Sequence, residues 1–190
     1  MRVENFFVGL IRTNNLKRGH LYRRYIAADW GLPRNLDAAF TWTNGKTYFF
    51  KRSLYWRYSN QTQDEGYPKL ISKGFDGIPD NIDAAFVWSG NGKIYFFKGS
   101  DYWRFDPDQS PPVRSSYPRP ISNWNGLPDN LDAALLYRNG FSYFFKGNDY
   151  WRFNDRAFAV NIFIDFYGLC LSSFRTSFIN ILFILCPFTY

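Results

Sequence analysis

The chain repeats a pattern of short apolar runs that predicts β-strands. The run Tyr-Phe-Phe-Lys begins at Tyr48, Tyr95 and Tyr143, in steps of 47 and 48 residues, and an Asp-Ala-Ala segment precedes each copy. In the second copy Asn91-Gly92 separates the two segments. Asn-Gly pairs favour tight hairpin turns because both residues accept positive φ angles. Each repeat therefore begins with a predicted antiparallel hairpin.

A third strand is predicted directly after each hairpin. In the run Asp-Tyr-Trp-Arg-Phe at 101–105, alternation along a strand places Tyr102 and Arg104 on one face and Trp103 and Phe105 on the other. One tryptophan recurs per repeat and is expected in the core between neighbouring sheets, at Trp56, Trp103 and Trp151. The recurring cations are expected at strand edges, in salt bridges or in solvent: Lys51, Lys98, Lys146, Arg57, Arg104 and Arg152.

The spacing of the repeats predicts the architecture. Residues 77–106 and 126–154 share 19 identities in 29 aligned positions with one gap. A sheet of three or four strands repeated about every 47 residues is typical of a β-propeller blade, which buries its faces against its neighbours. We therefore predict an all-β propeller. Its segments are a remnant of an earlier blade and connector at 1–30, blades at 31–76 and 77–125, a truncated last blade at 126–155 and an atypical hydrophobic tail at 156–190.

The tail departs from the repeat pattern. It is apolar, but Asp165 and Arg175 interrupt it, and the uninterrupted run at 178–186 is too short to span a bilayer. Three interpretations stay open: sequence foreign to the fold, such as a mis-predicted exon; an ordinary final strand and helix; or a membrane anchor. The two cysteines, Cys170 and Cys186, both lie in this tail, so no disulfide joins the repeats to one another.

Charge argues against a nucleic-acid partner. The net charge is +7, but residues 1–30 contribute +4, whereas residues 31–155 hold 15 Lys/Arg against 13 Asp/Glu. The repeated region is therefore nearly balanced, and its alternating aromatic and basic residues are better explained as strand faces than as a stacking platform for bases. An aromatic content of 22% also argues against a disordered chain and favours strands.

The repeated unit resembles the hemopexin-like repeat, and the run at 82–106 is similar to the C-terminal domain of matrix metalloproteinases. The resemblance covers about residues 22–154 and implies a four-bladed propeller, here incomplete, whose second, third and fourth blades these units resemble. It also implies a disulfide between the first and fourth blades, yet no cysteine precedes Cys170. An incomplete propeller would expose two unpaired blade faces, which favours association with other copies.

The repeated Asp-Ala-Ala segment is the candidate metal site. Equivalent positions on the first strand of each blade face the axis of a radial array, and Ca²⁺ accepts backbone carbonyl oxygens as well as carboxylates. The resemblance implies that backbone carbonyls hold a structural Ca²⁺ in the channel, at Asp37, Ala39, Asp83, Ala85, Asp132 and Ala134. An alternative is that the segment marks a tight packing point where only small side chains fit.

Catalysis has no support in this sequence. A metzincin zinc site needs three histidines, and haem ligation also uses histidine, but the chain has only His20. The resemblance implies a non-catalytic recognition domain of a secreted or membrane-type matrix metalloproteinase, with the zinc endopeptidase activity in an upstream domain. Such domains bind matrix proteins such as collagen, protein inhibitors of metalloproteinases and other copies of themselves.

An alternative of another class is a vitronectin-like matrix adhesion protein with the same repeat and no protease. Both interpretations place the protein outside the cell or at its surface, although residues 1–15 lack the features of a signal peptide. Asn60, Gln61 and Thr62 form an N-glycosylation sequon in the polar stretch after a predicted third strand. If the protein is secreted, Asn60 is a candidate glycosylation site.

Overall fold

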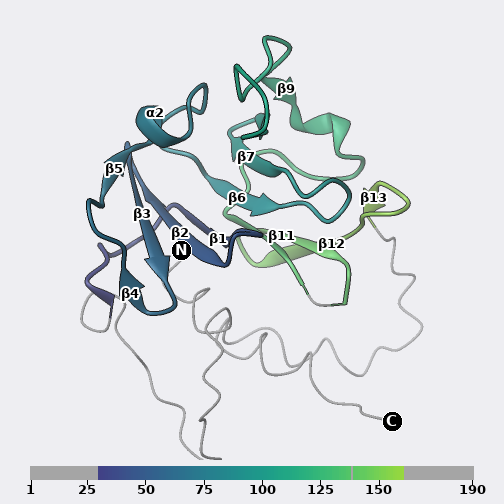
Figure 1. Cartoon of the computed structure of the whole chain (residues 1–190). Coiled ribbons are helices and arrows are strands. Elements are labelled where there is room, and N and C mark those ends of the chain that lie inside the picture. Colours follow the sequence, from purple (N-terminus) through teal and green to yellow (C-terminus); the bar gives the residue numbers. More distant parts are fainter. Residues whose placement is uncertain (1–29, 138, 161–190) are drawn as a thin grey trace, which may run out of the picture.

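A computed structural model describes residues 30–137 and 139–160, and these form three antiparallel β-sheets (Figure 1). Helical structure in these ranges is limited to the turn α2 (Ile71–Gly74), the 3-10 turn η2 (Ile121–Asn123) and Trp30. The predicted all-β fold is therefore confirmed. Within the described ranges no helix is long and apolar enough to cross a membrane.

Each sheet is built from consecutive strands in meander order, except that β5 of the first sheet pairs with β3. The first contains β1 (Ala38–Thr41), β2 (Lys46–Lys51), β3 (Leu54–Ser59), β4 (Thr62–Gln63) and β5 (Lys69–Leu70). The second contains β6 (Ala84–Val87), β7 (Ile94–Lys98), β8 (Asp101–Phe105) and β9 (Arg119–Pro120), and the third contains β10 (Ala133–Leu136), β11 (Ser142–Lys146), β12 (Asp149–Asn154) and β13 (Ala159–Val160). Registers repeat between sheets, as the identical sequences require: Phe49 pairs with Trp56 and Phe96 pairs with Trp103.

The predicted hairpin turns form, and the asparagine of each turn fixes its neighbours. The Asn91 side chain accepts a hydrogen bond from the Lys93 backbone N–H at 2.9 Å and donates one to the Tyr95 hydroxyl at 2.9 Å. Gly92 follows with φ +68°, a conformation that glycine adopts without steric cost. The repeated Asn-Gly pair therefore closes the turn and orients a tyrosine on the following strand.

The third sheet extends beyond the end that the sequence pattern indicated. Strand β13 pairs with the end of β12 and lies within the segment assigned to the tail. The Asn154 side chain turns the chain by accepting hydrogen bonds from the backbone N–H groups of Arg156 at 3.0 Å and Ala157 at 3.1 Å. The Val160 N–H then donates to the Asn125 carbonyl at 3.1 Å, which ties the third sheet to the connector that precedes it.

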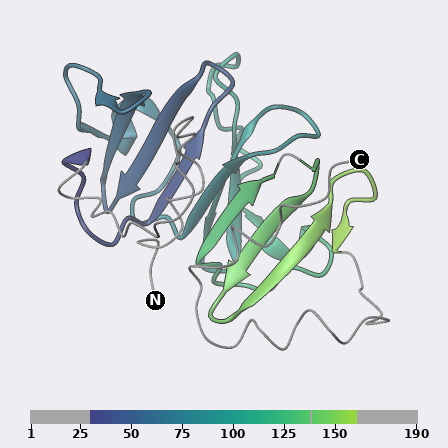
Figure 2. The same ribbon diagram turned by 90° about the horizontal axis from the view of Figure 1, so that it is seen from below.

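The three sheets are arranged so that their first strands converge. Strand β1 lies beside β6, and β6 lies beside β10, although each belongs to a different sheet. Figure 2 shows the sheets fanning out from these strands, with the later strands of each sheet farther from the centre. This is the propeller-like order that the repeat spacing predicts.

Aromatic side chains fill the space between neighbouring sheets. The predicted faces of β8 are confirmed, because Tyr102 packs toward the third sheet while Trp103 and Phe105 pack toward the first. Trp151 likewise lies in the core between the second and third sheets. Trp56 is buried on the face of the first sheet that is turned away from the second. Each tryptophan therefore points away from the sheet that follows its own.

Each connector between two sheets contributes one buried aromatic side chain to the core between those sheets. Phe75, after α2, is 2% exposed and contacts rings of both flanking sheets, among them Phe50 at 5.3 Å and Phe96 at 5.4 Å between centroids. Trp124, after η2, is 1% exposed and occupies the corresponding place in the next interface. Tyr150 is exposed on the face of the third sheet turned away from the second, and Leu136 is exposed at the end of β10.

Candidate functional site

The convergence of β1, β6 and β10 places the repeated aspartates at equivalent positions. Asp37, Asp83 and Asp132 each directly precede the first strand of a sheet. Their backbone N–H groups donate to the carbonyls of Phe50, Phe97 and Phe145, at 2.9, 2.8 and 2.7 Å respectively. The three aspartates therefore repeat one local geometry around the centre of the array.

The carboxylates of these residues are used within their own sheets. Asp83 Oδ2 accepts a hydrogen bond from the Gly99 backbone N–H at 2.7 Å, and Asp132 Oδ2 accepts one from Gly147 at 2.6 Å. Asp37 is bound in the same way by the Arg52 N–H at 2.6 Å, and it also pairs with Lys51 Nζ at 3.0 Å. The side chains thus fix the turn between the second and third strands of each sheet.

An axial ion would therefore depend on backbone oxygens. In the described ranges no group of three or more His, Cys, Asp or Glu side chains is positioned to hold a metal. Backbone carbonyl oxygens are suitable Ca²⁺ ligands. The predicted Ca²⁺ site could therefore form from carbonyls alone, while the aspartate carboxylates stay bound to the turns. Ala39, Ala85 and Ala134 pair with Phe49, Phe96 and Phe144 in the three sheets. Ala85 is 1% exposed, which also agrees with the packing explanation.

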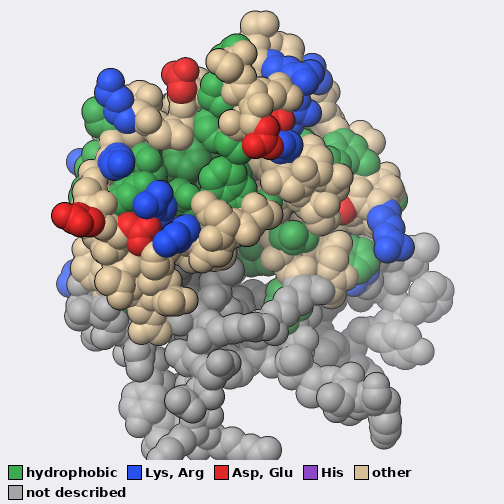
Figure 3. Space-filling view, viewed as in Figure 1, with side chains coloured by type: hydrophobic (Ala, Val, Ile, Leu, Met, Phe, Trp, Pro, Cys, Tyr) green, Lys and Arg blue, Asp and Glu red, His purple; other side chains and the backbone are tan. Residues whose placement is uncertain are grey.

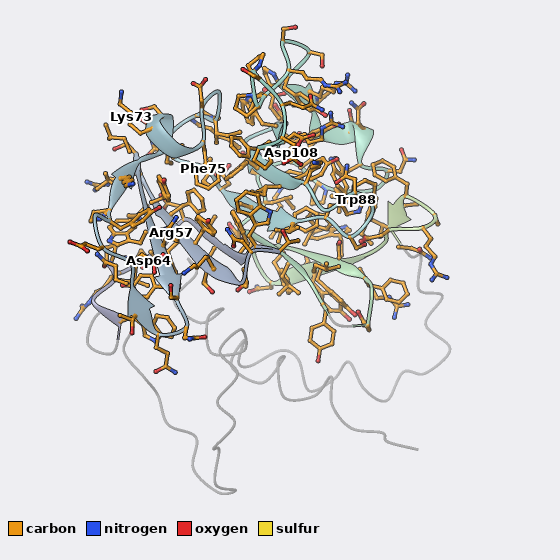
Figure 4. All side chains as sticks on the ribbon, viewed as in Figure 1. Arg57, Asp64, Lys73, Phe75, Trp88 and Asp108 are labelled. Atoms are coloured by element: carbon orange, nitrogen blue, oxygen red, sulfur yellow. The ribbon has the colours of Figure 1, made fainter. Side chains whose placement is uncertain are left out.

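The outer strands of the first sheet carry an ion cluster. Arg57 Nε pairs with Asp64 Oδ2 at 2.5 Å, Lys46 Nζ lies 3.7 Å from the same oxygen, and the Ser59 hydroxyl donates to the other carboxylate oxygen. The hydrogen bond from Ser59, together with Arg57, holds the pKa of Asp64 below its usual value. Figure 4 shows Arg57 and Asp64 next to each other at this edge.

The cations of this edge also contact a tyrosine. The Arg57 guanidinium and Lys69 Nζ each lie 4.8 Å from the ring centroid of Tyr67, a distance at which cation–π attraction operates. Arg57 thus fulfils the predicted salt bridge, as does Lys51 with Asp37. Lys98 instead donates to the Asp80 carbonyl at 2.8 Å.

The corresponding edge of the second sheet is arranged differently. Arg104 lies 5.9 Å and Arg119 lies 5.1 Å from the ring centroid of Tyr117. Lys93 Nζ forms salt bridges with both nearby carboxylates, at 2.7 Å from Asp106 Oδ1 and 2.9 Å from Asp108 Oδ2. Across residues 30–137 and 139–160 Arg104 forms no salt bridge and is half-buried at the strand edge.

Asn60 lies at a position compatible with modification. It is exposed in the turn between β3 and β4 and has φ +55°. The other predicted features, namely His20, Cys170, Cys186 and nearly all of the hydrophobic tail, lie outside the described residues.

Sequence reasoning missed Phe75 and Trp124, which join the sheets, and Arg114 and Arg119, which accompany Arg104 near Tyr117. A signal for the first was present, because Phe75 and Trp124 each stand two residues before the glycine that opens the next repeat. A signal for the second lay in the residue three places before each Tyr-Pro pair, which is Asp64 in one repeat and Arg114 in the next.

Comparison with known families decides what these sheets are. The hemopexin family model matches residues 36–80, 82–129 and 131–161, one match per sheet. The chain belongs to the hemopexin family. The hemopexin repeats of this chain are also similar to curated proteins of two kinds. Human (Homo sapiens) vitronectin is 54% identical over 65 residues, covering 33% of this chain and 14% of vitronectin.

Matrix metalloproteinases are the second kind of relative. Interstitial collagenase of Equus caballus is 44% identical over 69 residues, covering 33% of this chain and 15% of the collagenase. Mouse (Mus musculus) matrix metalloproteinase-21 is 40% identical over 110 residues, covering 51% of this chain and 19% of the relative. The chain therefore spans less than a fifth of the relatives that share its repeats.

Solved structures support the same fold. A seed albumin from Lathyrus sativus aligns with a TM-score of 0.59 at 22% identity, covering 70% of each chain, and a hemopexin-fold protein from cow pea aligns with a TM-score of 0.55. The hemopexin domain is non-catalytic, and the activity of the matrix metalloproteinases lies in a separate domain. The prediction that this chain is not itself an enzyme is confirmed.

Proposed function

We propose that this hemopexin domain is an extracellular recognition module that binds matrix proteins such as collagen and protein inhibitors of metalloproteinases. The observation that carries the proposal is the likeness of its repeats to both a collagenase and vitronectin, which are extracellular proteins. The geometry is compatible, because the repeated residues build the core while sequence differences between repeats lie at the outer edges, where partners have access.

Two parent proteins are candidates. A matrix metalloproteinase would carry its zinc endopeptidase activity in another domain, and the likeness to the collagenase and to matrix metalloproteinase-21 favours it. A vitronectin-like matrix adhesion protein is favoured by the higher identity, 54%, to human vitronectin. We propose with either candidate that a second copy associates through the face of the third sheet that carries the exposed Tyr150.

Binding to an inhibitor of metalloproteinases separates the two candidates. If this chain derives from a metalloproteinase, we expect it to bind an immobilised protein inhibitor of metalloproteinases in biolayer interferometry. A chain that binds collagen but not the inhibitor would instead support the vitronectin-like alternative. Loss of both interactions in a folded sample would contradict the recognition role.

We also propose two accessory features of the extracellular domain. The carbonyls at the starts of β1, β6 and β10 hold a structural Ca²⁺, and Asn60 carries an N-linked glycan. The glycan on Asn60 is tested with protein secreted from eukaryotic cells. Treatment with a glycosidase should increase the gel mobility of the wild type and leave that of Asn60→Gln unchanged. Equal mobility of the untreated proteins would contradict it.

A further inference from the structure

Tyr117, at the outer edge of the second sheet, lies close to arginines that form no salt bridge among the described residues, although the charge of Arg104 contributes to lowering the pKa of Asp106. Arg104 and Arg119 lie close to its ring, at 5.9 and 5.1 Å from the centroid. Burial raises the pKa of Tyr117, while the positive charges of Arg104, Arg119 and Arg114 act to lower it. In the part of the chain that the structure describes, none of these arginines forms a salt bridge. Figure 3 shows basic side chains gathered near β9.

The first sheet shows what the second lacks. Arg57 and Tyr67 occupy the positions of Arg104 and Tyr117, since each arginine lies on the third strand and each tyrosine precedes the proline of the connector. Arg57 Nε is satisfied by Asp64 at 2.5 Å. Arg104 Nε is buried and has no hydrogen-bond partner among the described residues.

The two repeats differ in the segment between the third-strand arginine and the tyrosine, which is three residues longer in the second repeat. Asp64 stands three residues before Tyr67, and the residue three places before Tyr117 is Arg114. A carboxylate in one repeat is therefore replaced by a guanidinium in the next. Arg114 is exposed, and its Nε donates to Gln109 at 2.9 Å. Counted back from the Tyr-Pro pair, the second repeat thus has a cation where the first has the anion that pairs with the third-strand arginine.

The nearby carboxylates of the second sheet do not replace Asp64. Lys93 holds both Asp106 and Asp108 at salt-bridge distance. A buried donor without an acceptor is costly, and a hydrogen bond from a charged donor contributes more than a neutral one. An oxyanion supplied from outside would therefore satisfy a group that the chain itself leaves unsatisfied.

We propose that Arg104, Arg114 and Arg119 bind a carboxylate from an acidic segment of a partner protein, which takes the place that Asp64 holds in the first sheet. The chain itself shows that this geometry accepts a carboxylate, because Asp64 does so beside Arg57. Guanidinium groups match carboxylates with two parallel hydrogen bonds. The inference deepens the proposed recognition role and rests on it for the partner being a protein.

The test is a fluorescence anisotropy titration with a labelled peptide rich in Asp and Glu. An Asn/Gln peptide of the same length is the probe control, and both are measured at physiological salt. Arg114→Asp restores the internal carboxylate and should weaken binding of the acidic peptide roughly tenfold or more, because about 1.4 kcal/mol of affinity corresponds to a factor of ten. Arg34→Asp makes the same charge change at an exposed residue of the first repeat and should leave the affinity within about twofold.

A converse variant tests the site by gain of binding. Asp64→Arg gives the first sheet the arginine arrangement of the second and should raise the binding stoichiometry from one peptide to two. Equal effects of Arg114→Asp and Arg34→Asp would overturn the site, since only net charge would then matter. Tighter, Arg114-dependent binding of a sulfated polysaccharide would overturn the choice of a protein partner.

The recognition role is tested separately on collagen. A wild type that binds collagen but shows no Arg114-dependent binding of the acidic peptide overturns this site and leaves the proposed function standing. A wild type that binds the peptide but neither collagen nor an inhibitor supports the site and contradicts the proposed function. The two failures are therefore distinguishable.

Discussion

The indole ring of Trp124 packs against the ring of Phe144, with 5.9 Å between their centroids and a 59° angle between their planes. Trp124 comes from the connector after the second sheet, and Phe144 lies at the centre of β11 in the third. The connector is therefore held by the sheet that follows it. Phe75 makes the equivalent contact with Phe96 across the preceding interface.

Removal of the Trp124 side chain should be among the substitutions that lower stability most. Trp124→Ala is expected to lower the free energy of unfolding by about 3–5 kcal/mol, the range for large aromatic side chains in a core. Leu136→Ala, at a residue that is 38% exposed, should change it by less than about 1 kcal/mol. Urea unfolding followed by far-UV circular dichroism, which does not rely on tryptophan fluorescence, measures the unfolding free energy of both variants. Similar effects of the two substitutions would contradict the packing described here.

Gly77 brings a connector into contact with the loop of the next sheet. It has φ +84°, and a Cβ atom there would lie 2.8 Å from Val113 Cβ. Gly77→Ala should therefore combine backbone strain, roughly 1–2 kcal/mol, with a steric clash. Gly92 also has a positive φ, +68°, but a Cβ atom there would meet no other atom within 4 Å. Gly92→Ala therefore measures the loss of stability from backbone strain alone.

The double variant Gly77→Ala with Val113→Gly, which removes the Val113 Cβ that the new side chain would meet, should recover the steric part of this loss. Chemical unfolding of the single and double variants provides the thermodynamic cycle. An effect of Gly77→Ala no larger than that of Gly92→Ala would show that the close approach does not contribute.

Asp64 makes stability depend on acid pH. Its pKa is lowered in the folded state, chiefly by the Ser59 hydrogen bond and then by Arg57. The stabilisation is therefore present above the unfolded-state pKa, about 3.9, and is lost as pH falls through the folded-state pKa. The difference in unfolding free energy between wild type and Asp64→Asn should shrink as pH is lowered from 6 toward 3. A difference that stays constant with pH would refute this origin, and Asp129→Asn serves as an exposed control.

Calcium should stabilise the converging strands if their carbonyls bind it. Bound Ca²⁺ raises stability by mass action, by about 2.7 kcal/mol when its free concentration is 100 times its dissociation constant. Differential scanning fluorimetry should show a higher Tm in Ca²⁺ than in chelator, and a smaller change in Mg²⁺, which prefers a tighter octahedral shell. The same Tm in all three conditions would argue for the packing explanation of Asp-Ala-Ala.

The sequence predicted the strands and their order well because the repeats copy both pattern and turn. Asn91-Gly92 marked a hairpin that forms, and the two faces of β8 followed from period-2 alternation alone. A final strand was only one of three interpretations left open for the tail, because β13 depends on the side-chain turn at Asn154, for which no repeated motif gave a signal.

The candidate site was less accessible to sequence reasoning. The sequence placed Asp37, Asp83 and Asp132 at the start of each first strand. Their carboxylates also accept hydrogen bonds from the backbone N–H groups in the turns between the second and third strands, and these bonds depend on three-dimensional geometry. The arginine cluster depends on a difference between repeats, whereas the sequence argument relied on what the repeats share.

The most direct test of the recognition role is binding of the purified chain to fibrillar collagen in biolayer interferometry. Trp124→Ala serves as a control in which the contact between the second and third sheets is disrupted. We predict saturable binding by the wild type that is reduced in this variant under conditions where the variant is partly unfolded. Absence of saturable binding by a wild type that shows a cooperative unfolding transition would contradict the proposal that this hemopexin domain recognises matrix proteins.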